Sequence, residues 1–411
     1  MTELTAALTE RFCRYVAVTS QSDAAQTTVP STPGQLELAR LLADELQTLG
    51  LSDIHIDEHG ILTAWREGSV PSAPKIGFVT HLDTVDVGLS PNIKPQVLRF
   101  DGSPLCLDWE KDLWLSPDER PEIMDYLGQD ILFSDGTSVL GADNKAGVAI
   151  IMQLLQQLHD DPFRCGDIYV AFVPDEEIGL RGAKRLDLKR FPVDFAYTID
   201  GAEVGELVYE TFNAALVTVT IQGVPAHPIS AKGVLVNPLL VAHDLIGRLP
   251  RLETPEHTEG REGYFYVTGI QGGPAQAKVL INIRDFDRSA YEARKTLVEQ
   301  YVQVTQAEHP RARLTCQIED VYGNILDAVG EDRRALTLLE QAFGIQGVQP
   351  HVKPMRGGTD GSALSARGLF TPNYFTGGHN FHSSFEFLPL NSFTKSYQVT
   401  ETLVRLGTQQ V

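Results

Sequence analysis

The chain has 411 residues, of which 42% are hydrophobic and 21% are charged. This composition is typical of a globular protein, and the length exceeds what one hydrophobic core normally serves, so we expect two domains. Acidic residues outnumber basic residues by 54 to 34, which gives a formal net charge of −20. That charge opposes binding to nucleic-acid phosphates and to anionic membrane surfaces, so no nucleic acid and no membrane is expected as a partner.

The cysteines and the start of the chain bear on its compartment. The four cysteines are scattered and form no C-x-x-C pair, which argues against a disulfide framework. Residues 1–18 carry several charges and lack the continuous apolar segment of a signal peptide, so we do not expect a secretion signal there. No uncharged apolar stretch approaches the ~20 residues that span a bilayer. We therefore expect a cytoplasmic location.

Two amphipathic helices are expected first in the chain. One covers residues 2–18, where apolar side chains recur at helical spacing. The other begins with Thr32 as its N-cap and Gln35 as the capping-box partner, and it stops before Gly50. Short strands are expected soon after this helix.

Polar side chains stand where three later strands end. These are His81 and Asp83, Glu176 and Glu177, and Asp200, after apolar stretches at 75–80, 167–173 and 195–199. A further carboxylate, Asp143, opens a helix. Each has a structural alternative: a helix cap, a structural His-x-Asp pair, or a solvated acidic turn. Because parallel strands end on one edge of a sheet, we expect the groups to converge, and this convergence favours a metal site.

The expected metal site has a clear division of roles. The two oxygens of Asp143 can each hold a different cation, so Asp143 can bridge a metal pair. One ring nitrogen of His81 can bind metal while Asp83 fixes the tautomer of the ring. Either His379 or His382 can supply the neutral imidazole for the second metal position.

Residues 91–133 and the middle of the chain differ from their surroundings. Residues 91–133 are rich in Pro, Asp and Trp and show weak periodicity, so we interpret them as a long surface excursion that serves a site. Residues 212–320 show the order β-α-β-β-α-β, which is typical of a ferredoxin-like domain. In this region His227 lies between two prolines and Arg284 ends a strand; the alternatives are a turn histidine and an arginine paired with neighbouring aspartates.

The expected fold class is α/β. Residues 1–211 and 324–411 would form a catalytic domain with a mixed, mostly parallel sheet covered by helices. Residues 212–323 would form an inserted α+β ferredoxin-like lid domain.

Several motifs together carry a family resemblance. Residues 81–84 (HLDT), 141–147 (GADNKAG), 174–177 (PDEE) and 197–201 (YTIDG) resemble the motifs of the di-zinc carboxypeptidase and aminoacylase-like metallopeptidases. Residues 231–234, 284–288, 356–361 and 375–378 resemble the tripeptide aminopeptidase branch of that family. One departure is Asn144, where that branch commonly has Asp, next to a cis peptide bond with the bridging aspartate.

The resemblance implies a role for each matching residue. Two Zn²⁺ ions per chain are implied, with Co²⁺ or Mn²⁺ as substitutes. His81, Asp143 and Asp200 would hold one ion, and Asp143, Glu177 and His382 the other. Catalytic roles fall to Glu176 as general base, Asp83 as partner of His81, and His227 as a group that polarises the scissile carbonyl. Substrate binding falls to Arg284, on the peptide's C-terminal carboxylate, with Asn324 and Arg356 nearby.

The expected function is therefore a zinc-dependent aminopeptidase that removes the N-terminal residue from tripeptides by a metal-bridged hydroxide. Its partners would be short peptides, and the protein would be a monomer or a homodimer. The alternatives are a related di-zinc dipeptidase, aminoacylase or desuccinylase, or a non-catalytic metal-binding protein with the same fold. The Arg284 segment and the excursion favour the tripeptidase, and a Glu176 that binds no metal argues against a non-catalytic protein.

Overall fold

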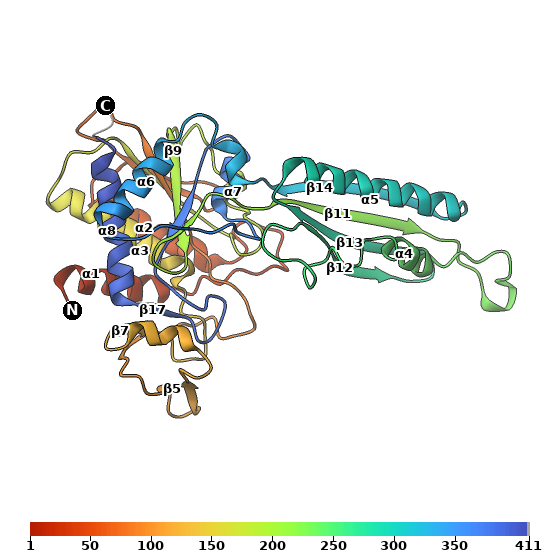
Figure 1. The fold of residues 1–411 in the computed structure, drawn as a ribbon, viewed down its shortest axis with the longest axis horizontal. Coiled ribbons are helices and arrows are strands. Elements are labelled where there is room, and N and C mark those ends of the chain that lie inside the picture. The colour runs from red at the N-terminus through yellow and green to blue at the C-terminus, as the bar shows by residue number, and fades with distance from the viewer. Residues whose placement is uncertain (409–411) are drawn as a thin grey trace. The chain divides into compact units, whose positions relative to one another are not determined.

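The structure, a computed structural model, describes residues 1–408 and divides into two compact units. Unit 1 comprises residues 1–209, 328–353 and the described chain from residue 359 onward. Unit 2 comprises residues 210–327 and 354–358. Figure 1 follows the chain through both units. No helix among residues 1–408 is long and apolar enough to cross a membrane, and the four cysteines are free thiols.

Unit 1 is built on an eight-stranded sheet with the strand order β1-β2-β8-β3-β9-β16-β10-β15. The strands are β1 Ser52–Ile56, β2 Leu62–Arg66, β3 Ile76–His81, β8 Ile168–Val173, β9 Phe195–Gly201, β10 Glu206–Val208, β15 His351–Val352 and β16 Asn373–Phe375. The four strands at its centre, β8, β3, β9 and β16, run parallel to one another. β3 and β8 are buried along their whole length, as expected for strands covered on both faces.

Helices cover this sheet (Figure 1). They are α1 Glu3–Val16, α2 Pro33–Thr48, α3 Ala142–Asp160, α6 Arg334–Ile345, α7 Asp360–Ser365 and α8 Leu390–Leu406. α3 packs on β3 and β9 and also contacts α1 and α8. The mixed, mostly parallel sheet with covering helices confirms the predicted fold class.

The predicted capping box of α2 is wrong. The Thr32 hydroxyl donates to the carbonyl oxygen of Gln21 and does not cap the helix. Thr32 is the N-cap residue, as predicted, and Gln35 Nε2 donates to its hydroxyl at 3.1 Å, but neither side chain bonds to the backbone as a capping box requires. Gln35 also donates from Nε2 to Oδ1 of Asp175 at 2.7 Å, and its Oε1 accepts from the Asp175 backbone amide. The start of α2 is therefore bonded to the turn that follows β8.

The interpretation of residues 91–133 as a loop is also wrong in part. They contain β4 Gln96–Arg99, β5 Leu105–Asp108, β6 Leu113–Leu115, the 3₁₀ helix η1 Pro121–Tyr126 and β7 Asp130–Phe133. β4 and β7 form a three-stranded sheet with β17 (Phe387–Pro389), over a small apolar cluster that includes Phe100, Phe133 and Phe387. Strands of three or four residues are too short to show a clear period in the sequence.

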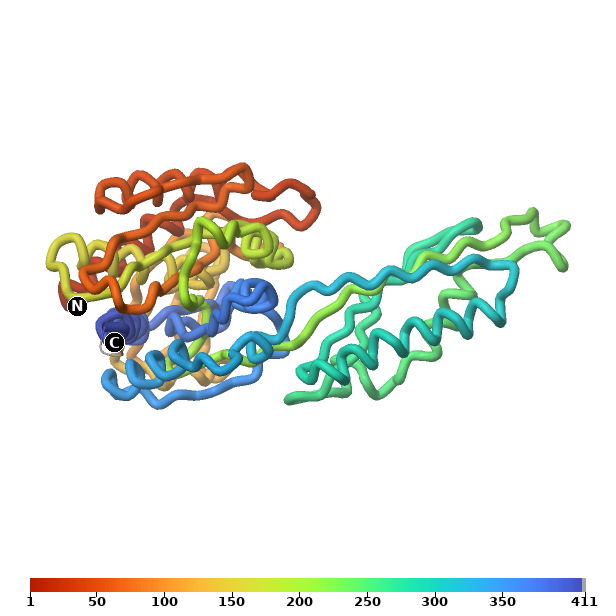
Figure 2. Tube along the Cα trace, turned by 90° about the horizontal axis from the view of Figure 1, so that it is seen from above, coloured from red at the N-terminus to blue at the C-terminus, as the bar shows by residue number. Residues whose placement is uncertain are grey.

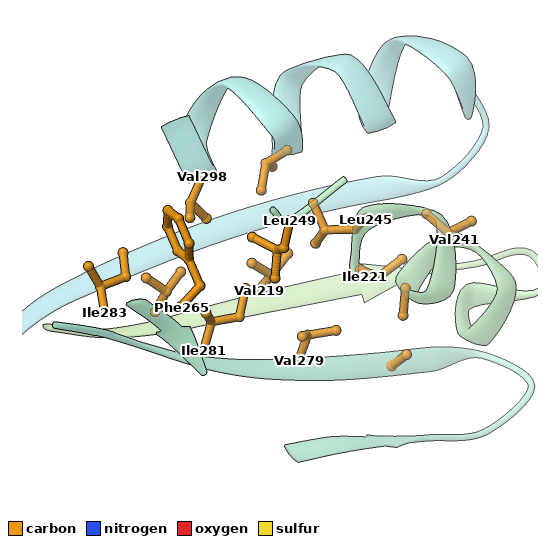
Figure 3. Packing of buried hydrophobic residues seen from close by; sticks show 14 of the residues in the cluster. Val219, Ile221, Val241, Leu245, Leu249, Phe265, Val279, Ile281, Ile283 and Val298 are labelled. Atoms are coloured by element: carbon orange, nitrogen blue, oxygen red, sulfur yellow. The ribbon is translucent and has the colours of Figure 1, made fainter. Parts of the chain in front are cut away.

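Unit 2 is a four-stranded antiparallel sheet with the order β12-β13-β11-β14 and two helices. Its elements are β11 Asn213–Gln222, α4 Pro238–Ile246, β12 Tyr264–Gly272, β13 Gln276–Asp285, α5 Arg288–Glu308 and β14 Arg313–Tyr322. This is the predicted β-α-β-β-α-β order, and Figure 2 shows it in the green to light-blue part of the trace. Apolar side chains from the sheet and both helices, such as Ile281, Leu245 and Val298, form one core (Figure 3).

Candidate metal centre

Three strand ends and one helix start bring the predicted ligands together. β3 lies between β8 and β9 in the sheet, and the three run parallel, so their carboxyl ends share one edge. His81 is the last residue of β3, Glu176 and Glu177 follow β8, and Asp200 is near the end of β9. Asp143 lies in the first turn of α3.

Asp143 presents one carboxylate oxygen to each of two histidines. His81 Nε2 lies 2.9 Å from Asp143 Oδ1 and 3.6 Å from Asp200 Oδ1. His382 Nε2 lies 3.1 Å from Asp143 Oδ2 and 3.0 Å from Glu177 Oε1. In each of these two groups the potential ligand atoms lie within 4.8 Å of one another. The structure therefore forms two groups that share Asp143.

The structure distinguishes the two candidate histidines of the last segment. His379 Nε2 is 2.6 Å from the hydroxyl of Tyr126, and its ring stacks on Phe387 at 4.8 Å. His379 thus belongs to the packing of residues 91–133, and His382 belongs to the carboxylate cluster. Glu176 also lies close to the centre, because it forms a third possible ligand group with His81 and Glu177.

Asp83 holds the turn that carries the two glutamates. Its carboxylate accepts the backbone amide of Glu176 at 3.0 Å and that of Glu177 at 3.2 Å. The Nδ1 atom of His81 is nearest to the backbone oxygen of Asp83, at 3.0 Å, and lies 3.4 Å from its Oδ1. Asp83 therefore contacts His81, as the sequence suggests, but its carboxylate mainly orders the glutamate turn.

Two other ligand positions are held through their backbone. The amide of Asp200 donates to Oδ1 of Asn373 at 2.9 Å. The Asp143–Asn144 peptide bond is cis, as the resemblance implies, and Asn144 is buried. The backbone of Asp200 is thus bonded to β16, and Asp143 is joined to a buried neighbour.

The crowding of acidic groups shifts their pKa values. Burial, together with neighbouring carboxylates, raises the pKa of Glu176 and Asp200 well above the usual range and that of Glu177 to about 7. Burial alone would lower the pKa of His81, but Asp200 and the other carboxylates outweigh it and raise it. Hydrogen bonds to Asp143 and Glu177 raise the pKa of His382 to about 10. The carboxylates of the cluster therefore favour a positive charge next to His81 and next to His382.

The residues present fit a pair of divalent cations. Asp200 Oδ1 is buried and has no hydrogen-bond partner within the described chain, so a cation is the partner that this oxygen suits. Imidazole nitrogens and carboxylate oxygens are ligands that Zn²⁺ accepts, and that Co²⁺ and Mn²⁺ accept as well. Three ligand carboxylates carry a charge of −3, which two divalent cations more than neutralise.

His227 and Arg284 lie in unit 2. His227 is exposed and caps a 3₁₀ turn, where its Nδ1 accepts the amide of Ile229. Arg284 donates to the backbone oxygen of Ile283 at 3.0 Å, and its guanidinium lies over the ring of Tyr322. The alternative pairing of Arg284 with neighbouring aspartates is not formed within residues 1–408.

Asn324 and Arg356 also lie in unit 2, where their side chains form hydrogen bonds. The Asn324 side chain accepts the amide of Thr211 and donates to the backbone oxygen of Phe286. Arg356 donates to the backbone oxygens of Gly260 and Glu262 and to the Thr258 hydroxyl. Substrate contact by these residues stays a prediction.

Three buried charged residues near the centre were missed in the sequence. Lys145 is fully buried and donates to the backbone oxygen of Val18 at 3.0 Å; burial lowers its pKa to about 7. Asp360 is 2% exposed, its Oδ1 has no partner among the described residues, and burial raises its pKa to about 7. Glu386 is 2% exposed and binds the backbone next to Asp143. Their positions inside or just after the recognised motifs were the available signal.

Comparison of the sequence with known proteins shows which family the chain belongs to. The sequence model of peptidase family M20/M25/M40 matches residues 141–406. The chain belongs to this family. Its membership confirms the predicted metallo-exopeptidase class. A peptidase T-like protein of Yersinia pestis is 59% identical over 396 residues, 96% of each chain. Peptidase T of Bacillus subtilis is 42% identical over 393 residues, 95% of this chain and 96% of the relative.

Solved structures show the same fold in the family. Aminopeptidase PepT of Bacillus cereus superposes with a TM-score of 0.76 at 21% identity and 98% coverage of each chain. A dinuclear metal-binding peptidase of family M20 from Bacillus subtilis gives 0.65 at 15% identity, with 99% coverage of each.

Proposed function

We propose that this metallopeptidase is an aminopeptidase that removes the N-terminal residue from tripeptides, with two zinc ions held by His81, Asp143, Glu177, Asp200 and His382. The observation that carries the metal part is the single carboxylate of Asp143, which faces both histidine–carboxylate groups. The substrate part is supported by relatives named peptidase T that match nearly the whole chain at 40–42% identity.

The two cations, when bound, would polarise the scissile carbonyl and lower the pKa of a water molecule toward ~7. Glu176 takes a proton from the attacking water and returns it to the leaving amine. The raised pKa of Glu176 suits this task, because a carboxylate with a low pKa would bind the proton of the water too weakly. Asp83 fixes the backbone of Glu176 and Glu177, so the base and the adjacent ligand keep separate orientations.

Two residues of unit 2 complete the proposed mechanism. The Arg284 guanidinium binds the C-terminal carboxylate of the peptide through two parallel hydrogen bonds. This contact would restrict substrates to short peptides with a free C-terminal carboxylate. His227 donates a hydrogen bond to the carbonyl oxygen as negative charge develops there.

A peptide-length series tests the proposal. Alanine di-, tri- and tetrapeptides, each with a free or an amidated C-terminus, are assayed beside N-acetyl and N-succinyl amino acids, with the metal-loaded and the chelated protein. We expect chelator-sensitive release of the N-terminal residue from the free tripeptide, and a large loss of activity on amidation. Equal turnover of all lengths would contradict the tripeptide assignment, and preferred cleavage of N-acetyl or N-succinyl amino acids would support the aminoacylase or desuccinylase alternative.

A further inference from the structure

Glu386 is a buried carboxylate, and within residues 1–408 its side-chain hydrogen bonds all go to the turn that carries Asp143. Its Oε2 and Oε1 accept the backbone N–H groups of Leu140 (2.7 Å), Gly141 (3.0 Å), Ala142 (2.7 Å) and Asp143 (3.3 Å). Two oxygens thus hold four consecutive amides.

This turn depends on an outside acceptor for its shape. Gly141 has a φ of +77°, and Asp143 and Asn144 have non-helical backbone angles inside the first turn of α3. The first N–H groups of a helix have no partner within the helix, and buried amides without partners are costly. The Glu386 carboxylate satisfies them, so the orientation of Asp143 rests on it.

The segment that carries Glu386 also carries His382. The backbones of His379 and Phe387 pair through two hydrogen bonds, of 2.9 and 3.1 Å, which close residues 379–387 into a loop. His382 and Glu386 both lie within this closed loop. Tyr126 and Glu122, from the excursion, bond to His379 and Asn380 at 2.6 Å each. The same loop thus supplies one ligand directly and reaches the shared ligand through Glu386.

We propose that Glu386 is a positioning residue of the metal centre. By holding the backbone of residues 140–143, it sets the place of Asp143 relative to His382. The inference rests on the metal part of the proposed function and not on the peptide substrate. Loss of a group that orients a metal ligand typically lowers metal affinity by roughly 10–100-fold.

The test compares Glu386→Gln with the wild-type protein by Co²⁺ titration of the metal-free forms. The glutamine keeps one oxygen for four amides and turns an NH₂ group toward two of them. We expect a roughly 10–100-fold weaker Co²⁺ affinity, a changed visible spectrum of bound Co²⁺, and faster hydrogen exchange of amides 140–143. The matched control is Glu206→Gln: Glu206 is a buried carboxylate on β10 that pairs with Lys353, and we expect it to leave Co²⁺ binding unchanged.

Each outcome decides the proposal. Wild-type affinity and spectrum in Glu386→Gln would overturn it, and so would weaker binding with unchanged amide exchange, because that result assigns the effect to charge alone. If Glu386→Gln does not fold, Glu386→Asp is the test, because it keeps the carboxyl group on a shorter side chain. We expect a Co²⁺ affinity weaker than that of the wild type, and a wild-type affinity would overturn the proposal. A wild-type protein that binds two Co²⁺ ions but cleaves no tripeptide would refute the proposed substrate and leave this inference standing.

Discussion

At the scale of the residue, two adjacent glutamates have different surroundings. Glu177 meets His382 at 3.0 Å, so its charge has a direct partner. At Glu176, burial and the neighbouring carboxylates disfavour the negative charge and raise the pKa. The contact with His382 supports the proposed ligand role of Glu177, and the absence of such a contact at Glu176 among the described residues suits its proposed role in proton transfer.

Glu176→Gln tests this division. We expect the turnover number to fall by at least about 10²-fold, the usual contribution of a general base, while metal content stays near two ions per chain. Steady-state kinetics and elemental analysis on one preparation measure both quantities. Loss of one metal ion would show that Glu176 is a ligand.

Arg284→Ala tests the proposed carboxylate contact. Hydrogen bonds to a charged group contribute about 1.5–3 kcal/mol, so we expect KM for a free tripeptide to rise by roughly 10–100-fold with little change in metal content. Arg284→Lys should recover part of the loss, and Arg313→Ala, an exposed arginine on β14, serves as control. An unaltered KM would remove the proposed contact.

Lys145→Met tests the cost of a buried amine. Burial lowers the pKa of Lys145 to about 7, whereas lysine in an unfolded chain has a pKa of ~10.4. Between pH 7 and pH 10.4 the unfolded chain binds more protons than the folded protein, so the free energy of unfolding rises with pH in this range. Burial of Lys145 therefore destabilises the folded wild-type protein most at pH 7 and below, and less as the pH rises.

We therefore expect the metal-free Lys145→Met protein to gain stability over wild type at pH 7, and the gain to shrink by about 1.4 kcal/mol per pH unit toward pH 9. Urea unfolding at both pH values measures the difference in the free energy of unfolding. Lys189→Met, at an exposed lysine, should show no such trend, and a constant difference for Lys145→Met would contradict the argument.

At the scale of the element, the start of α3 is a tightly constrained turn. Gly141 has a positive φ, and an added Cβ would lie 3.0 Å from Ile93 Cδ1 and 3.2 Å from Thr84 Cγ2. The turn therefore needs glycine for its conformation and for its space. Asp143 is two residues away, so a change in this turn reaches the shared ligand.

Gly141→Ala should lower both stability and Co²⁺ affinity. We expect a loss of about 1–2 kcal/mol in the free energy of unfolding, from the left-handed backbone and the close contacts. Gly344→Ala is the control, because Gly344 lies in α6 with open space around its Cα; alanine there should stabilise by roughly 0.5–1 kcal/mol. Unchanged metal affinity in Gly141→Ala would separate the turn from the centre.

At the scale of the whole molecule, each unit has a core of its own. The apolar cluster of unit 2 draws on its own sheet and helices, and the candidate metal ligands all lie in unit 1. A ligand that binds only the folded state stabilises it in proportion to its concentration over its dissociation constant. Metal should therefore act first on unit 1.

Hydrogen exchange with and without Zn²⁺ measures this effect. We expect slower exchange at residues 140–143, 175–177 and 381–383, and little change in β11 and β13 of unit 2. Equal protection of both units would contradict the local action of the metal. Thermal unfolding should also shift to higher temperature with Zn²⁺ and return on chelation.

The sequence by itself determined the central strands of unit 1, the order of elements in unit 2 and the convergence of most of the candidate ligands. Alternation and apolar runs predict β3, β8 and β9, and parallel strands end on one edge, so His81, Glu177 and Asp200 had to be neighbours. The order β-α-β-β-α-β likewise predicts the sheet of unit 2. These results follow from short-range periodicity, which a sequence displays directly.

Only the tertiary structure decided which partners several of the side chains contact. The residue patterns left His379 and His382 as alternatives, did not indicate that the Gln35 side chain also bonds to Asp175, and did not indicate Glu386. The amides that Glu386 holds are about 245 residues away in the chain. Contacts of that kind leave no period in a sequence, because they form only when separate elements pack against one another.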